Sequence, residues 1–352
     1  MGGEMGDEQM DARSRRRLHS ISALALMSLS VSTATAQTAT ARLVSAANTF
    51  MATLDQKQRG RVLFAYDDEE QRRRWSNLPT AMVRRAGLGL GEMSAAQRSA
   101  ALALVSSALS GRGFEKVQEI MEADEVLKTN EGNNPLFGKD LYFVSILGAP
   151  SEKDPWMLQF GGHHLALNIT IAGERGILTP SLIGAQPALY TANGKTVRPL
   201  GRESDKAFVL LNALDETQRK QAILNYRVAD LVLGPGQDGK TIQPEGLKAS
   251  AMNEPQRALL LDLISEWTGI VHESAADARM AEVKAGLGET WFAWSGPTTV
   301  ITGRNGTAYY RIQGPNLVIE YAPQRLGGDL SLHVHSMYRD PTNDYGARLT
   351  AK

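Results

Sequence analysis

The chain has 352 residues, with 38 basic and 38 acidic side chains, a formal net charge of zero and 42% hydrophobic residues. This composition is typical of a globular protein, and it argues against a disordered chain and against nucleic-acid binding driven by bulk charge. The sequence has no cysteine, which excludes thiol catalysis, disulfides and cysteine-ligated metal centres.

Residues 1–36 have the features of an export signal. Arginines at positions 13, 15, 16 and 17 precede an apolar stretch of small residues, and Ala34-Thr35-Ala36 has the A-x-A pattern of a cleavage site. The run from Ser14 to Leu18 resembles the twin-arginine export motif, with an ordinary secretory signal as the alternative. No other stretch is long and apolar enough to span a membrane. We therefore expect an exported protein, periplasmic or extracellular, with no transmembrane segment in its mature part.

Short motifs recur in the same order in the two halves of the chain. The motif L-D-x-x-Q-R occurs twice, as does M-x-x-x-Q-R. The matching segments are 54–59 and 214–219, 93–98 and 252–257, 141–150 and 290–297, and 162–168 and 314–320. Matches that keep their order indicate an internal duplication.

Each half begins with helical patterns and ends with strand patterns. The helical segments are 54–66, 93–109, 114–127, 214–231, 252–267 and 274–284. The strand segments are 141–147, 156–160, 164–171, 291–294, 308–312, 317–321 and 331–337. Asp55 and Asp215 stand where helix N-caps belong. The pattern predicts an α+β fold of two helix-then-antiparallel-sheet halves, 37–200 and 201–352, related by a pseudo-twofold axis and packed as one unit. Such packing is compatible with a monomer.

Four of the six histidines form two clusters. His163 and His164 follow two glycines at a turn that enters a strand. His333 and His335 are two positions apart on a strand, so period-2 alternation places both imidazoles on one face. Such histidines are either metal ligands or residues with ordinary hydrogen bonds at a turn or on the surface.

The repeat adds a carboxylate to this constellation, because it aligns Asn168 with Glu320. If the two sheets meet at the pseudo-axis, these residues converge with the histidines. We expect a divalent transition metal, with Zn favoured and Fe, Mn or Cu as alternatives. Its predicted ligands are His163 or His164, Glu320, His333 and His335.

The polar segment 338–346 supplies candidate catalytic residues. Arg339 can hold a substrate anion through its planar guanidinium. Asp340 or Asp344 can orient a histidine or act as a general base. Asn168, which shares a strand face with His164, is the fourth candidate. The alternative for the tail is a simple turn, because Asp-Pro and Asp-Tyr-Gly are turn sequences.

Five aromatic residues gather in the second half of the chain, and we expect them in the core, with sugar stacking as the alternative. They are Trp291, Trp294, Tyr309, Tyr310 and Tyr321. The segment 234–241 matches the G-x-x-x-x-G-K-[ST] pattern of nucleotide-binding loops. Pro244 and Gly246 prevent the helix that this pattern requires after its lysine, so we interpret the segment as a loop.

The motif G-G-H-H-L-A-L-N at 161–168 and the motif H-V-H-S-M-Y-R-D-P-T-N-D-Y-G at 333–346 resemble the family catalogued as domain of unknown function 3500. The segment ending at Pro150, the Pro155-Trp156 pair and the strand around Glu320 add to the resemblance, which covers roughly residues 43–346. It implies an exported protein of bacterial type with fungal relatives, and it carries over no activity.

From the residues we predict an exported metal-dependent enzyme that acts on a small-molecule or saccharide-like substrate and binds no nucleic acid. Hydrolysis of an ester, amide or sugar-derived substrate is favoured. Oxidative chemistry is the expectation if the metal is Fe or Cu. The alternative is a non-catalytic ligand-binding protein of the periplasm or cell surface, with a structural metal or none.

Overall fold

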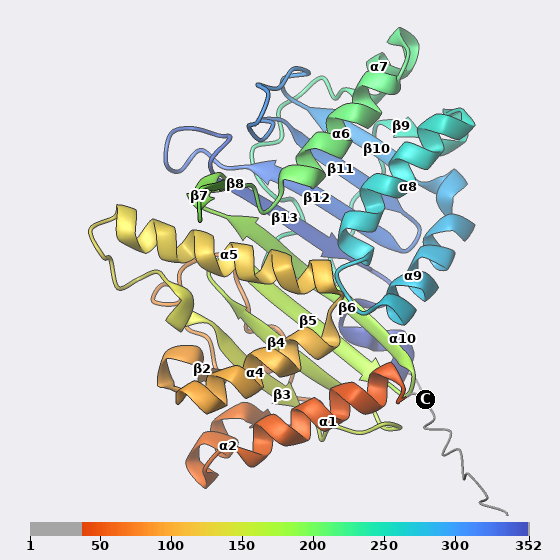
Figure 1. Ribbon diagram of the computed structural model, residues 1–352. Coiled ribbons are helices and arrows are strands. Elements are labelled where there is room, and N and C mark those ends of the chain that lie inside the picture. Colours follow the sequence, from red (N-terminus) through yellow and green to blue (C-terminus); the bar gives the residue numbers. More distant parts are fainter. Residues whose placement is uncertain (1–36, 351–352) are drawn as a thin grey trace, which may run out of the picture. The chain divides into compact units, whose positions relative to one another are not determined.

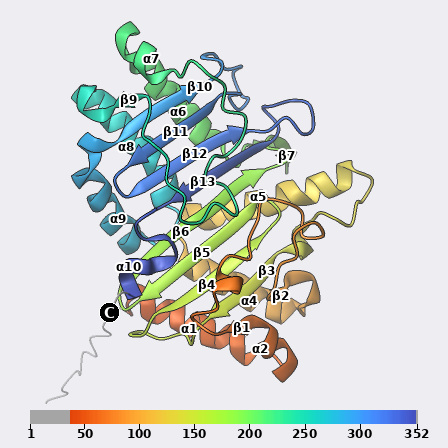
Figure 2. The same cartoon turned by 180° about the vertical axis from the view of Figure 1, so that it is seen from behind.

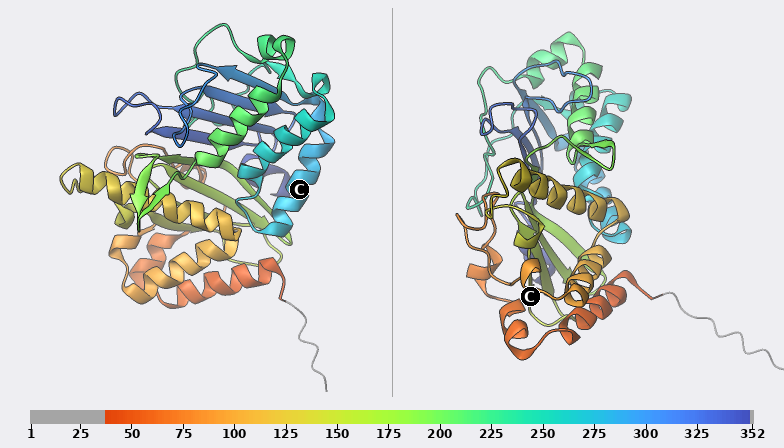
Figure 3. Two further views of the ribbon diagram at one scale, coloured as in Figure 1. Left: turned by 45° about the horizontal axis from the view of Figure 1, so that its top comes forward. Right: turned by 60° about the vertical axis from the view of Figure 1, so that its left-hand side comes forward.

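The computed structural model describes residues 37–350, which form one large sheet with the longer helices on one face (Figures 1 and 3). The export signal expected at 1–36 lies outside the described residues. The α-helices are α1 (Ala39–Ala52), α2 (Gln56–Val62), α3 (Glu69–Arg72), α4 (Ala95–Ala108), α5 (Gly111–Asn130), α6 (Gly201–Ala213), α7 (Glu216–Ala222), α8 (Glu254–Thr268), α9 (Glu273–Ala285) and α10 (Ala347–Thr350). Within the described range, none of them combines the length and the apolar character needed to cross a membrane.

The sheet of the described residues has eleven strands in the order β1-β3-β4-β5-β6-β13-β12-β11-β10-β9, with β2 paired to β3. Its pairs are antiparallel except for β1 with β3, so the sheet is mixed. The strands are β1 (Leu63–Phe64), β2 (Leu88–Gly89), β3 (Phe143–Leu147), β4 (Trp156–Gly162), β5 (Leu165–Ala172), β6 (Arg175–Ala185), β9 (Leu247–Lys248), β10 (Trp291–Ser295), β11 (Tyr309–Gly314), β12 (Leu317–Pro323) and β13 (Val334–Arg339). A separate hairpin pairs β7 (Tyr190–Ala192) with β8 (Lys195–Val197). The α+β prediction is confirmed.

The same succession of elements occurs twice along the chain. The order α1, α2, β2, α4, α5, β3 to β6 is followed by α6, α7, β9, α8, α9, β10 to β13. Both short second helices, α2 and α7, begin with an aspartate N-cap, Asp55 and Asp215, as predicted. The strands of the two stretches join through the antiparallel pair β6–β13, in which His335 lies opposite Gly184.

One predicted helix ends earlier in the structure, and three main elements were not predicted. The helix expected at 214–231 ends at Ala222, because Ile223 enters a β-bridge with Trp294 and the chain continues as a loop. The helices α1 and α6 were not predicted. Neither was β6, the central strand, whose Gly176, Pro180 and Gly184 interrupt the strand pattern.

The two faces of the sheet are covered in different ways. Helices cover the face on which Trp294, Tyr310 and Tyr321 stack, with interplanar angles of 9° and 7°. Two long loops, 65–87 and 224–246, cross the opposite face (Figure 2). A small apolar cluster of Trp75, Met337 and their neighbours lies beneath these loops. The residues with candidate chemistry lie mainly on this loop-covered face.

Candidate metal centre

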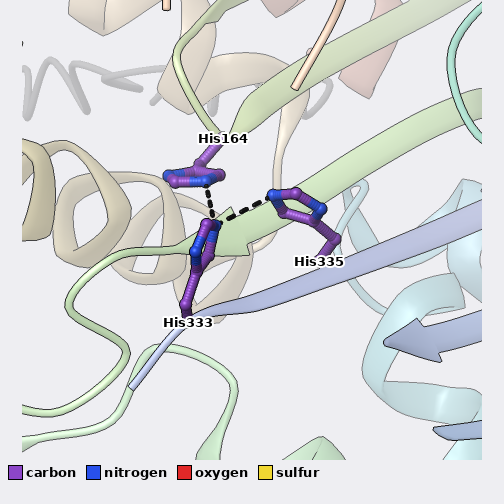
Figure 4. A group of neighbouring side chains, drawn as sticks. All are labelled: His164, His333 and His335. Carbon is purple, nitrogen blue, oxygen red and sulfur yellow. Dashed lines mark hydrogen bonds between the residues drawn. The ribbon is translucent and has the colours of Figure 1, made fainter. Parts of the chain in front are cut away.

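Three histidines from distant parts of the sequence meet at the end of the β6–β13 pair (Figure 4). His164 lies in the turn between β4 and β5, His333 directly precedes β13, and His335 lies within β13. The Nε2 atom of His333 is 2.9 Å from Nε2 of His164 and 3.2 Å from Nε2 of His335. The side chains are nearly inaccessible, with 2–5% exposure. We call these three residues the histidine cluster.

Strand geometry brings two of these rings together and a glycine makes room for the third. His333 and His335 project to one side because alternate residues of a strand share a face. Opposite His335, Gly184 has no side chain, and a Cβ there would lie 3.3 Å from carbon atoms of both His164 and His335. Any larger residue at 184 would therefore press on two rings of the histidine cluster.

The His164 backbone has an unusual conformation, with a φ of 61°. Only a few per cent of non-glycine residues adopt this left-handed region, with asparagine, aspartate and histidine the most frequent among them, and it costs about 1 kcal/mol or more. The left-handed conformation of His164 therefore lowers the local stability, and it places the imidazole ring in the histidine cluster. Such positions concentrate at functional sites.

Hydrogen bonds fix the tautomer of two rings. The Nδ1 atom of His333 is 3.0 Å from the carbonyl oxygen of Leu326. A carbonyl only accepts, so Nδ1 carries the hydrogen and Nε2 of the neutral ring presents a lone pair. The Nδ1 atom of His335 faces the side-chain amide of Asn77 at 3.3 Å and the carboxylate of Asp230 at 3.8 Å. The amide nitrogen of Asn77 donates to this Nδ1, so the hydrogen of the neutral His335 ring lies on Nε2, which donates it to the Nε2 lone pair of His333.

The three rings of the histidine cluster are poor sites for an additional proton. Burial, followed by the neighbouring histidines, lowers the pKa of His164 well below its ordinary value. The same causes lower the pKa of His333 to about 4. For His335, burial lowers the pKa although Asp230 acts in the opposite direction. The rings are therefore neutral near pH 7, and neutral imidazoles are the form that binds metals.

The spacing fits a metal ion. Ligand nitrogens about 2.0–2.1 Å from a tetrahedral Zn²⁺ lie roughly 3.3 Å apart, close to the two observed separations of 2.9 and 3.2 Å. Three histidine ligands leave a fourth position open, an arrangement found in catalytic rather than structural zinc sites. The histidine cluster can hold a divalent transition metal.

His163 lies beside the histidine cluster and points elsewhere. Its Nδ1 atom is 2.7 Å from Oδ1 of Asp124 in α5, and Oδ2 of Asp124 accepts a hydrogen bond from the Gly138 amide at 2.8 Å. The rings of His163 and His164 contact each other with centroids 3.7 Å apart and an interplanar angle of 31°. Of the two adjacent histidines, His164 joins the cluster and His163 pairs with an aspartate.

The structure does not bring Glu320 to the histidine cluster, contrary to our expectation. Glu320 and His335 share a face of the sheet, but the Glu320 carboxylate turns toward the loop 224–246. It accepts hydrogen bonds from the backbone amides of Val232 and Leu233 at 2.7 and 2.8 Å and from the Tyr309 hydroxyl at 2.7 Å. These three donors give the fully buried carboxylate partners without any metal.

Asn168 and Arg339 also have partners within the protein. The Asn168 amide donates to the carbonyl of Pro180 at 2.8 Å and accepts from Gln159 at 2.9 Å. The buried guanidinium of Arg339 donates to the carbonyls of Leu233 and Gly234 and to two carboxylates, Asp238 and Asp344. Arg339 therefore fastens the loop 224–246 and the C-terminal tail to the sheet.

The two tail aspartates, Asp340 and Asp344, belong to the same network of hydrogen bonds and ion pairs. Asp340 accepts from the amide and hydroxyl of Thr342 and pairs with Arg279 at 3.0 Å. Asp344 accepts from the Asp340 amide at 3.0 Å. Burial raises the pKa of Asp344 to about 6 although Arg339 opposes this shift. The contacts of both aspartates lie among these tail and α9 residues, whereas the histidine cluster has Asp230 and Asn77 beside it.

Several residues that shape the histidine cluster carry no sequence signal that we used. Asn77 and Asp230 come from the two loops that cross the sheet, and loops lack the periodicity that places helices and strands. The Leu326 carbonyl is a backbone group, which any residue would supply. Gly184 is the exception, because a glycine inside a strand indicates a close approach of other atoms.

A comparison with protein families gives one match for this chain. The model of the family described as "Protein of unknown function (DUF3500)" matches residues 36–347. Comparisons with curated proteins and with solved structures give no match. The resemblance inferred from the two histidine motifs is thus confirmed, and the matched range includes the whole histidine cluster.

Proposed function

The chain belongs to the DUF3500 family, and we propose that it is a metal-dependent enzyme whose metal is held by His164, His333 and His335. The observation that carries this proposal is the convergence of three buried histidine rings, whose Nε2 atoms are separated by 2.9 and 3.2 Å. A cation bound between the rings would replace the hydrogen bonds between them by coordination. Zn is favoured, with Fe, Mn or Cu as alternatives.

We favour hydrolysis of an ester, amide or sugar-derived substrate. A zinc ion with three imidazole ligands acts as a Lewis acid and lowers the pKa of a water in its open position, so no protein nucleophile is required. The Asp230 carboxylate, 3.8 Å from Nδ1 of His335, is placed to support the ligand role of that ring by electrostatic attraction. Oxidative chemistry is the corresponding proposal for Fe or Cu.

Exposed apolar side chains on the segments around the histidine cluster favour a small-molecule substrate with an apolar part. Leu326, whose carbonyl contacts His333, is 75% exposed. Leu78 follows Asn77 and is 39% exposed, and Leu136 precedes Phe137, which contacts the His163 ring, and is 41% exposed. Apolar groups near a polar centre are typical of small-molecule sites.

A second candidate is a non-catalytic binding protein with a structural metal. The burial of the three rings, at 2–5% exposure, favours this candidate, because structural metal sites are closed to solvent. We further propose that the protein is exported and that its fold arose by duplication. The A-x-A pattern at 34–36 and the repeated order of helices and strands support these two proposals.

The proposed activity can be tested with protein purified without a histidine tag. Zinc-loaded and chelated samples would be assayed against nitrophenyl esters, anilides and glycosides, beside the variant His164→Asn. We expect hydrolysis of at least one substrate class that a chelator abolishes, that added zinc restores and that the variant lacks. A metal-loaded protein without chelator-sensitive turnover of any substrate would instead support the binding-protein candidate.

A further inference from the structure

A cavity of about 140 Å³ lies between α9, the start of β6 and the C-terminal segment. Most of its wall is apolar, and the principal apolar residues are Ile177, Leu178, Trp267, Val271, Ala275 and Ala278. Four charged side chains, Glu174, Arg175, Arg279 and Glu282, also line it, and three of them, all but Arg279, are exposed, so the pocket opens to solvent on that side. None of these side chains takes part in the histidine cluster described above.

The cavity occupies the position that corresponds to the histidine cluster in the other half of the sheet. Ile177 pairs with Thr170 across β5–β6 as His335 pairs with Ala322 across β12–β13. Arg175, two residues before Ile177, has the place that His333 has before His335. Neither isoleucine nor arginine is a metal ligand, so the corresponding position has a different wall chemistry.

Small residues create the space. Ala275 and Ala278 line the cavity from α9 and Gly176 lines it from β6. A Cβ at Gly176 would lie 3.7 Å from the Cβ of Ala275, which is ordinary contact distance. The small side chains thus leave an apolar hollow beside Trp267, with Ala278 on its exposed side.

We propose that this cavity is a second ligand site that binds a small apolar molecule about the size of one aromatic ring. A cavity of about 150 Å³ has room for one benzene ring, and the volume here is about 140 Å³. The indole of Trp267 forms part of the wall and is held by a hydrogen bond to the Ser336 hydroxyl at 2.9 Å. An aromatic wall that is fixed in this way suits a flat apolar guest.

The experiment uses the full chain with benzene, toluene and indole as probes, and it follows binding by calorimetry and by the thermal midpoint. We expect saturable binding of at least one probe with about one equivalent per chain, and a rise of the midpoint with probe concentration. Ala278→Leu, which fills the cavity from an exposed helix position, should weaken binding at least tenfold. Ala281→Leu, on the same helix and outside the cavity, should leave binding unchanged.

The result would not depend on the metal. Binding should persist in chelated protein and in the variant His333→Ala/His335→Ala, so failure of the metal proposal and failure of this one are distinguishable. Ala278→Val, a smaller filling, should give an intermediate loss if Ala278→Leu disturbs folding. Absence of saturable binding of all three probes, or equal affinity in wild type and both Ala278 variants, would overturn the proposal.

Discussion

The histidine cluster and the Glu320 carboxylate are both buried polar groups on the loop-covered face of β12 and β13, but their surroundings differ. The oxygens of Glu320 accept three hydrogen bonds from the loop 224–246 and Tyr309. The Nε2 atoms of the histidine cluster instead make hydrogen bonds with one another, at 2.9 and 3.2 Å. Ligand atoms that bond to one another can exchange these bonds for a cation, whereas the Glu320 oxygens already have fixed donors, and four predictions can break or sharpen this contrast.

The largest effect on stability is expected at Glu320. Glu320→Ala leaves two buried amides and a hydroxyl without an acceptor, so the free energy of unfolding should fall by roughly 3 kcal/mol or more. His335→Ala in the presence of a chelator should lower it less, by about 1–2 kcal/mol, because it removes hydrogen bonds to two side chains rather than the shared acceptor of three buried donors. Urea unfolding of both variants measures the difference. Equal losses, or loss of metal by Glu320→Ala without loss of stability, would contradict the contrast.

The free energy of unfolding of the chelated protein should depend on pH, because the buried rings are neutral in the folded state. Histidine has a pKa of ~6.5 in an unfolded chain, and burial lowers that of His333 to about 4 in the folded protein. Between these values the unfolded chain binds more protons, so stability falls as pH falls, by roughly 2 kcal/mol. The variant His333→Ala/His335→Ala should lack this component. Urea unfolding curves that change in parallel with pH for both proteins would argue against neutral buried rings.

The Asp230 carboxylate should affect the metal rather than the fold. Asp230→Asn removes the negative charge beside His335, and loss of such a partner typically lowers metal affinity about tenfold. Asp238→Asn is the matched control, because Asp238 lies on the same loop and pairs with Arg339 instead. Competition with a chromophoric chelator measures both affinities. A similar affinity in the two variants would show that Asp230 does not support the ligand.

The smallest effect on the metal-free fold is expected at His164. Its φ of 61° suits glycine better than histidine. His164→Gly should leave the stability of the chelated protein unchanged or raise it by up to ~1 kcal/mol, while the stabilisation by added zinc disappears. Asn133→Gly, at an exposed left-handed residue with a φ of 62°, controls for the backbone effect. A large loss of stability in chelated His164→Gly would indicate a structural role for the ring.

Helices and strands with a strong hydrophobic periodicity were predicted from the sequence, and elements without such a periodicity were missed. Helices α4, α5, α8 and α9 and the strands around both histidine motifs were predicted. Alternation along β13 was sufficient to place His333 and His335 on one face. The central strand β6 was missed because its glycines and proline hide the pattern.

The contacts of the site that could not be predicted from the sequence are made by loops. The alignment of Asn168 with Glu320 is correct in strand register, since Gln159 pairs with Asn168 as Arg311 pairs with Glu320. Register fixes a position along a strand and does not fix where a long side chain ends. The amides of the loop 224–246 decide that Glu320 turns away from the histidines.

The most direct test of the central claim is the metal content of untagged protein, measured by elemental analysis after purification and after reconstitution. We predict about one equivalent of a divalent transition metal per chain in the wild type and in Glu320→Gln, and none in His333→Ala/His335→Ala. A wild-type protein that holds no metal even after reconstitution would contradict the account, as would a metal that remains in the double variant.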